Sequence, residues 1–115
     1  MNIQEFAKEI YDELGCGYSE AVYHNAFEVI LRKHGIHYET ERIVPITFKG
    51  HVIGNLRSDL IIEGDVVVEL KSARNITDVM RVQLHNYLKL TGISKGMLIN
   101  FPLTGEDIHV EMCYK

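Results

Sequence analysis

A mixed β-sheet covered by helices, an α/β (α+β) arrangement, is the fold class that this sequence predicts. Periodic and extended segments follow one another in the order helix, helix, three strands, helix, strand, strand. Apolar strands interrupted by a helix need a layer of helices to bury their faces. The chain has 115 residues, of which 46% are hydrophobic and 24% charged, which is enough for one core. Residues 1–115 are therefore expected to form a single domain.

Three helices are predicted from apolar residues at spacings of three and four. They cover residues 2–14, residues 20 to about 34, and residues 78–91. Each has a capping residue before it and a glycine after it. These pairs are, in chain order, Asn2 and Gly15, Ser19 and Gly35, and Thr77 and Gly92.

The third helix carries a polar residue on its apolar side. Its predicted buried residues are Val79, Met80, Leu84, Tyr87 and Leu90. Gln83 lies between Leu90 and Tyr87 around the helix, so its amide is expected to face the core. The basic stripe Arg81, His85 and Lys89 lies on the other side and is expected to be solvated.

Five extended segments are predicted at 36–48, 51–62, 66–71, 95–101 and 108–114. Pro45 suggests an edge or a bend in the first, and Lys49-Gly50 is typical of a turn into the second. The run Val66-Val67-Val68 indicates a buried strand. The last segment alternates between polar and apolar residues, as an edge strand does.

The loop Glu63-Gly64-Asp65 decides which residues of the second and third strands face one another. If all three residues form the loop, Asp59 faces Glu69 across the hairpin. A two-residue loop would put Asp59 opposite Val68 and would separate the two acids onto opposite faces. A site that uses both acids therefore requires the three-residue loop.

Several polar residues stand where the pattern expects apolar ones. Glu69 and Lys71 end the buried strand and, being two residues apart, share one face. Converging carboxylates repel one another unless one is protonated or a cation lies between them. Oxygen ligands without His or Cys favour Mg²⁺ or Mn²⁺, and a neighbouring lysine suits chemistry on phosphate. The candidate site residues are Glu20, Asp59, Glu69, Lys71 and Gln83.

These residues carry a resemblance to a known family. Asp59, followed after nine residues by Glu69-Leu70-Lys71, resembles the PD-(D/E)XK nuclease signature, with Ser58 in the place of the proline. Residues 17–23 read as G-x-x-E-x-x-Y and residues 83–87 as Q-x-x-x-Y. Together with Leu98-Ile99-Asn100-Phe101, they resemble the small GxxExxY protein family within that superfamily, over about residues 3–101.

The resemblance implies a restriction-endonuclease-like α-β-β-β-α-β core with an extra N-terminal helix and a C-terminal strand. It implies hydrolysis of phosphodiester bonds in nucleic acid, taken to be DNA, with 5′-phosphate products. Lys71 would orient water or stabilise charge, and Gln83 would position the lysine, water or phosphate. Tyr23 and Tyr87 suit core packing as well as the site. The implied ligands of Mg²⁺ or Mn²⁺ are Asp59, Glu69, the Leu70 carbonyl and, directly or through water, Glu20.

Charge and composition bear on partners and compartment. The net charge of −4 argues against a broad electrostatic grip on nucleic acid, although residues 71–95 hold five basic residues and one acid. That strip suits either a polyanion or a solvated helix face. No segment has the apolar length of a membrane span, no signal peptide is present, and two distant cysteines suggest a cytoplasmic setting. A chain of this size would need a homodimer or a partner to act on a duplex.

Two other interpretations stay open. The chain could be a nucleic-acid-binding or regulatory module that keeps the nuclease fold without cleaving. Alternatively, Glu69 and Lys71 could form a structural ion pair with Asp59 as a turn acid, which leaves the positions of Glu20 and Gln83 unexplained. Metal binding separates this last interpretation from the others, and turnover separates an enzyme from a binding module.

Overall fold

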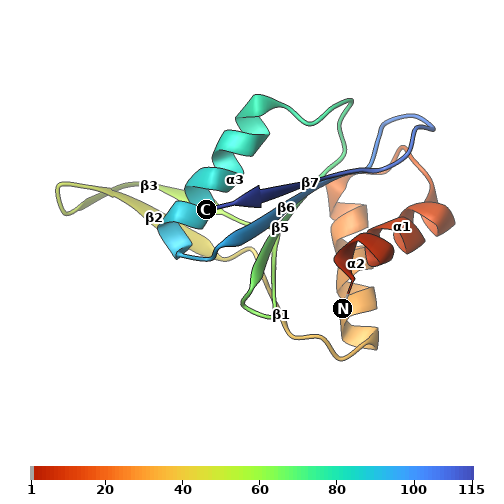
Figure 1. The fold of residues 1–115 in the computed structure, drawn as a ribbon, viewed down its shortest axis with the longest axis horizontal. Coiled ribbons are helices and arrows are strands. Elements are labelled where there is room, and N and C mark those ends of the chain that lie inside the picture. Colours follow the sequence, from red (N-terminus) through yellow and green to blue (C-terminus); the bar gives the residue numbers. More distant parts are fainter. Residues whose placement is uncertain (1) are drawn as a thin grey trace.

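The computed structural model describes residues 2–115, which form three helices and seven strands (Figure 1). The helices are α1 (Ile3–Leu14), α2 (Glu20–Lys33) and α3 (Asp78–Thr91). The strands are β1 (Tyr38–Thr40), β2 (Ile43–Phe48), β3 (His51–Arg57), β4 (Leu60–Ile62), β5 (Val66–Lys71), β6 (Lys95–Asn100) and β7 (His109–Tyr114). Within residues 2–115, no helix is long and apolar enough to cross a bilayer.

Five strands form the central sheet in the order β1-β4-β5-β6-β7. The pair β5 and β6 is parallel and the other pairs are antiparallel, so the sheet is mixed. Helices flank this sheet, which confirms the predicted α/β (α+β) class. The predicted strand 108–114 is confirmed as β7, an edge strand.

Two separate core clusters show which helix covers which face of the sheet. Val66, Val68 and Leu70 of β5 pack in one cluster with side chains of α1 and α2. Val67, between them on the strand, packs in the other cluster with Leu84 and other residues of α3. Because side chains alternate along a strand, α1 and α2 lie on one face and α3 on the opposite face, as Figure 1 shows. Glu69 and Lys71 alternate with Leu70 and therefore share the α3 face.

The hairpin between β4 and β5 has the register that the site requires. Ile62 pairs with Val66, and the Asp65 amide donates to the Ile62 carbonyl oxygen at 3.0 Å. Glu63 and Gly64 have φ of 55° and 63°, so the turn uses two left-handed residues. The three-residue loop is confirmed. It places Asp59, just before β4, level with Glu69.

Two predicted strands are wrong in extent, because each is broken in the middle. The segment 36–48 becomes β1 and β2, and the segment 51–62 becomes β3 and β4. Glu41 has a φ of 51°, a left-handed conformation that cannot continue a strand. Its amide donates to the Asp59 carbonyl oxygen at 3.1 Å, which holds the two breaks side by side. Beyond them, β2 and β3 leave the sheet as a separate two-stranded ribbon (Figure 1).

The buried side of α3 differs from the prediction. Leu84, Tyr87 and Leu88 are buried, whereas Val79 and Leu90 are 66% and 41% exposed. Gln83 is exposed, so the expectation that its amide faces the core is wrong. The helix is rotated because it packs both on the sheet and against β2, so that its contact stripe lies on the side of Leu88.

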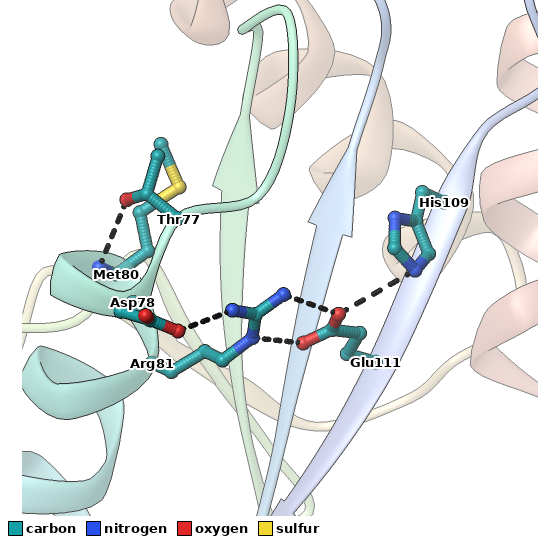
Figure 2. A network of polar contacts seen from close by, with 6 residues as sticks. All are labelled: Thr77, Asp78, Met80, Arg81, His109 and Glu111. Carbon is teal, nitrogen blue, oxygen red and sulfur yellow. Dashed lines mark hydrogen bonds and ion pairs between the residues drawn. The ribbon is translucent and has the colours of Figure 1, made fainter.

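Polar contacts join α3 to the edge strand β7 (Figure 2). Arg81 donates from Nε to Glu111 Oε2 at 2.7 Å and from Nη2 to Glu111 Oε1 at 2.8 Å. It also pairs with Asp78 at 2.6 Å, and His109 Nε2 lies 3.5 Å from Glu111 Oε1. The bonds from Arg81 lower the pKa of the Glu111 carboxyl. Of the stripe predicted to be solvated, Arg81 is thus engaged, while His85 and Lys89 are exposed.

The contact between α3 and β6 depends on the absence of a side chain at Gly96. A Cβ atom built there would lie 3.0 Å from both Cδ atoms of the buried Leu84. Gly96→Ala is therefore expected to lower the free energy of unfolding by about 2 kcal/mol through overpacking. Urea denaturation measures this change. Gly54→Ala is the control, because its Cβ would meet its nearest atom at an ordinary 3.6 Å; equal losses in the two variants would contradict the prediction.

Candidate functional site

Asp59 and Glu69 are held together by two hydrogen bonds to main-chain amides. The Leu70 amide donates to Asp59 Oδ2 at 2.7 Å. The Asp59 amide donates to Glu69 Oε1 at 3.3 Å. Each carboxylate is thus anchored through one oxygen, which leaves Oδ1 of Asp59 and Oε2 of Glu69 for another partner.

The electrostatics of this pair disfavour two negative charges side by side. Burial and, to a lesser extent, the adjacent Asp59 charge together raise the pKa of the Glu69 carboxyl to about 8, although Lys71 lowers it in part. One lysine therefore does not compensate the two acids. A proton on Glu69, or a cation between the carboxylates, relieves the repulsion.

Glu69 and Lys71 open onto a cavity on the α3 face of the sheet. The cavity has a volume of about 150 Å³ and is also lined by Gln83 and Tyr87 of α3. The exposed Gln83 therefore reaches the predicted neighbours, Glu69 and Lys71, from the rim. Asn55 and Arg57 of β3 line the same cavity from the root of the ribbon.

Glu20 lies on the other side of the site. It is the exposed first residue of α2, which covers the opposite face of the sheet from α3. With Asp59, Glu20 lines a separate cleft of about 390 Å³, to which His24, Glu28 and Glu41 also contribute. Asp59 thus borders Glu20 on one side and contacts Glu69 on the other.

The predicted three-acid cluster is not assembled in the part of the chain that the structure describes. Within residues 2–115, no group of three or more His, Cys, Asp or Glu side chains is placed to hold a metal ion together. Asp59 and Glu69 adjoin, whereas Glu20 belongs to a helix on the other face. The sequence pattern placed all three acids at one end of the sheet, but it did not show that α2 and α3 lie on opposite faces.

A buried hydroxyl pair holds the strand break that precedes Asp59. Ser58 is 1% exposed, and its hydroxyl donates to the Tyr87 hydroxyl at 3.1 Å. Tyr87 in turn donates to the Arg42 carbonyl oxygen at 2.9 Å. Ser58, which stands in the place of the signature proline, therefore connects Asp59 to α3. Tyr87 lines the cavity and also packs in the core.

Tyr23 is a core residue that also fixes the chain leading into α2. It is fully buried, and its ring stacks on Phe101 with 4.1 Å between centroids. Its hydroxyl donates to the Gly15 carbonyl oxygen at 2.7 Å and accepts from the Tyr18 amide at 3.4 Å. These bonds place the start of α2, where Ser19 is the N-cap residue without a side-chain bond of its own. Tyr23 thereby positions Glu20.

Three residues with a clear structural relation to the site were not predicted from the sequence. Asn55 and Arg57 reach the cavity only because β3 bends away from β4, and local sequence does not show that bend. Asn100 is 3% exposed, and its amide exchanges two hydrogen bonds of 2.9 Å with the main chain of Ala73, beyond Lys71. In the sequence, the signal for this role was Asn100 itself, a single amide residue at the end of the apolar strand β6.

Two of the five basic residues in the strip at 71–95 are paired with acids. Arg81 pairs with Asp78 and Glu111, and Lys95 pairs with Asp65 at 3.1 Å. Lys71 is the member of this strip that lines the cavity. The interpretation of the strip as a solvated face therefore holds better than that of a continuous polyanion site.

Comparison with known proteins identifies a family model and similar solved structures. Residues 1–111 match the family model of the PD-(D/E)XK nuclease superfamily. Among solved structures, the chain is similar to the crystal structure of SSO0001, with 25% sequence identity and a TM-score of 0.64. The similarity covers 83% of this chain and 49% of that one, so this chain spans about half the length of that structure. No curated protein sequence matches the chain.

Proposed function

Because the chain belongs to the PD-(D/E)XK nuclease superfamily, we propose that it is a metal-dependent nuclease that hydrolyses phosphodiester bonds of DNA. With β1–β2 and β3–β4 each counted as one kinked strand, the elements from α2 to β6 follow the α-β-β-β-α-β order of a restriction-endonuclease-like fold. The helix α1 and the strand β7 are additions to this core. The observation that carries the proposal is the contact of Asp59 with Glu69 beside Lys71 at the end of β5.

The two acids fit a hard divalent cation. Mg²⁺ commonly uses one or two carboxylates and keeps several waters, so two protein carboxylates are sufficient. Asp59 and Glu69 each have one oxygen free of main-chain bonds, and the Leu70 carbonyl is the proposed third protein ligand. Bound there, Mg²⁺ or Mn²⁺ would supply positive charge for phosphate oxygens and for water. Glu20, which lines the 390 Å³ cleft together with Asp59, is proposed to act through water.

The side chains of the cavity have separate roles in the proposed reaction. Lys71, on the same face as Glu69, holds the attacking water or stabilises the charge that grows on the phosphoryl oxygens. Gln83, at the exposed rim, positions the lysine, the water or the phosphate. The water oxygen bonds to phosphorus while the bond from phosphorus to the 3′ oxygen breaks. The products are a 5′-phosphate and a 3′-hydroxyl end.

The finer family assignment is also part of the proposal. The GxxExxY element, residues 17–23, combines a left-handed Gly17 with a φ of 93°, the cleft residue Glu20 and the buried Tyr23. Each motif residue thus has a distinct structural position, which supports membership of the GxxExxY family. We further propose that two copies act together on a duplex, because one chain of 115 residues offers little surface for it.

Metal binding gives the first test. Mg²⁺ or Mn²⁺ is expected to raise the midpoint of thermal unfolding of the parent protein, and Asp59→Asn or Asp59→Ala should lose this increase. The asparagine variant keeps an oxygen that accepts from the Leu70 amide, so the hairpin itself is preserved. The exposed acid Asp107, changed to Asn, is the matched control. Equal midpoint increases with Mn²⁺ in the parent and in Asp59→Asn would contradict the metal site.

Turnover is tested with a panel of labelled substrates. Single-stranded, duplex and branched DNA, together with RNA, are incubated with the protein in Mg²⁺ or Mn²⁺, alongside Asp59→Asn. Cutting by the parent alone supports the nuclease and identifies the substrate class. Metal binding without any cutting would instead favour a binding or regulatory module that retains the fold.

A further inference from the structure

The ribbon formed by β2 and β3 is a narrow projection from the body of the protein (Figure 1). Its tip is a two-residue turn, since Phe48 pairs with His51 and the intervening Lys49 and Gly50 have φ of 49° and 81°. A lysine is an unusual choice for a left-handed position, which other residues occupy at lower cost. The turn therefore presents a basic side chain at the farthest point of the ribbon.

Several large apolar side chains on this ribbon are exposed to solvent. Val44 and Leu56 pack toward α3, which covers one side of the ribbon root. Ile46 is half-buried, whereas four other large apolar residues are exposed, namely Ile43 at 59%, Phe48 at 60%, Val52 at 64% and Ile53 at 65%. Such a group of exposed apolar side chains on one projection indicates a surface that contacts another molecule.

The ribbon is also basic, in contrast to the chain as a whole. Residues 43–57 contain Lys49 and Arg57 and no acid, although the net charge of the chain is −4. Lys49 Nζ lies 5.7 Å from the centroid of the Phe48 ring. Within residues 2–115, neither Lys49 nor Arg57 forms an ion pair with a carboxylate. Both charges are therefore available to an anionic partner.

The root of the ribbon meets the candidate site. Arg57 and Asn55 line the cavity that contains Glu69 and Lys71. A polyanion that contacts Lys49 at the tip can thus continue past Arg57 to Lys71. A second copy of this ribbon is a poorer partner, because two such ribbons would bring basic residues together without an acid between them.

We propose that the β2–β3 ribbon is a DNA-binding arm that enters the major groove of a duplex and directs its backbone to the site. This inference rests on the proposed function, because it names the substrate that the same site would receive. The major groove of B-form DNA, about 12 Å wide, admits a two-stranded ribbon, whereas the deep and narrow major groove of A-form RNA does not. Lys49 would contact phosphate, and Phe48 would contact base edges such as thymine methyl groups.

Binding is tested without cleavage by measuring the anisotropy of a labelled 20-base-pair DNA duplex in a buffer free of divalent metal. The tip variant Phe48→Ser with Lys49→Gln is compared with the parent over a range of salt concentrations. The control, Val29→Ser with Lys33→Gln, makes the same kinds of change on the exposed side of α2, where Val29 is 53% exposed. Thermal unfolding of each variant checks that the fold is retained.

The tip variant is expected to bind about tenfold more weakly than the parent, with a salt dependence that is shallower by about 0.9 for the lost phosphate contact. The control should match the parent. Unchanged affinity and slope in the tip variant would overturn the proposal, as would the absence of duplex binding by the parent or equal binding of duplex RNA. A change from dimer to monomer with intact DNA binding would also overturn it, by assigning the ribbon to contact between copies. If the parent binds DNA through the ribbon but does not cleave any substrate, the DNA-binding role of the ribbon is supported and the nuclease proposal is contradicted.

Discussion

Replacement of Lys71 by alanine is expected to lower the rate of nucleic-acid cleavage by about 10²-fold or more, without loss of metal binding. Lys71 shares the cavity with Glu69, but it does not supply a carboxylate or a hydrogen bond to either acid. Removal of the ammonium takes away the group that orients water or stabilises charge on phosphate. The acids that would hold Mg²⁺ or Mn²⁺ remain in place.

Two measurements are needed for this prediction. Cleavage rates are compared at saturating metal, and the midpoint of thermal unfolding is compared with and without Mn²⁺. Lys71→Met retains the apolar stem of the side chain and separates packing from charge, while Lys89→Ala removes an exposed lysine from α3 as a control. If Lys71→Ala loses the metal-dependent increase of the midpoint, the lysine is structural and its assigned role is wrong.

Glu69→Gln is expected to stabilise the metal-free protein at alkaline pH. The pKa of the Glu69 carboxyl is about 8 in the folded protein, compared with 4.5 for an unperturbed glutamate. A raised pKa means that the folded state holds the proton more tightly than the unfolded state. The corresponding stability is fully present below about pH 4.5 and is lost as the pH rises through 8.

The free energy of unfolding of the parent, measured with urea in a metal chelator, should therefore fall between pH 5 and pH 9. Glu69→Gln should remove most of this decrease and be more stable than the parent at pH 9 by roughly 3 kcal/mol, allowing for partial solvent exposure. At pH 5 the two proteins should differ little, because Glu69 is then protonated. Addition of Mg²⁺ at pH 9 should restore the stability of the parent alone, since a cation replaces the proton between the carboxylates.

Glu20→Gln provides the control for this pH dependence. Glu20 is exposed and lines the other cleft, beside Asp59 and not Glu69, so its replacement should leave the pH profile unchanged. Parallel pH profiles for the parent and Glu69→Gln would show that Glu69 does not carry the effect. The prediction would then fail even if Glu69 is needed for cleavage.

Local sequence determined the helices and the register at the site. Asn2 accepts from the Glu5 amide and Thr77 from the Met80 amide, as their capping positions predicted. The count of three residues in the loop before β5 correctly placed Asp59 level with Glu69. These features depend on neighbouring residues in the chain, so spacing and residue type are sufficient to predict them.

Only the tertiary structure shows which helix covers which face of the sheet and where the predicted strands are interrupted. The left-handed Glu41 and the bonded break at Ser58 divide two strands and release the ribbon, although both segments are locally continuous in pattern. The contact of α3 with β2 as well as the sheet turns Gln83 to the exposed rim. The placement of α2 on the face opposite α3 separates Glu20 from Glu69. Periodicity shows that a helix has an apolar side, but which partner that side meets depends on residues far away in the sequence.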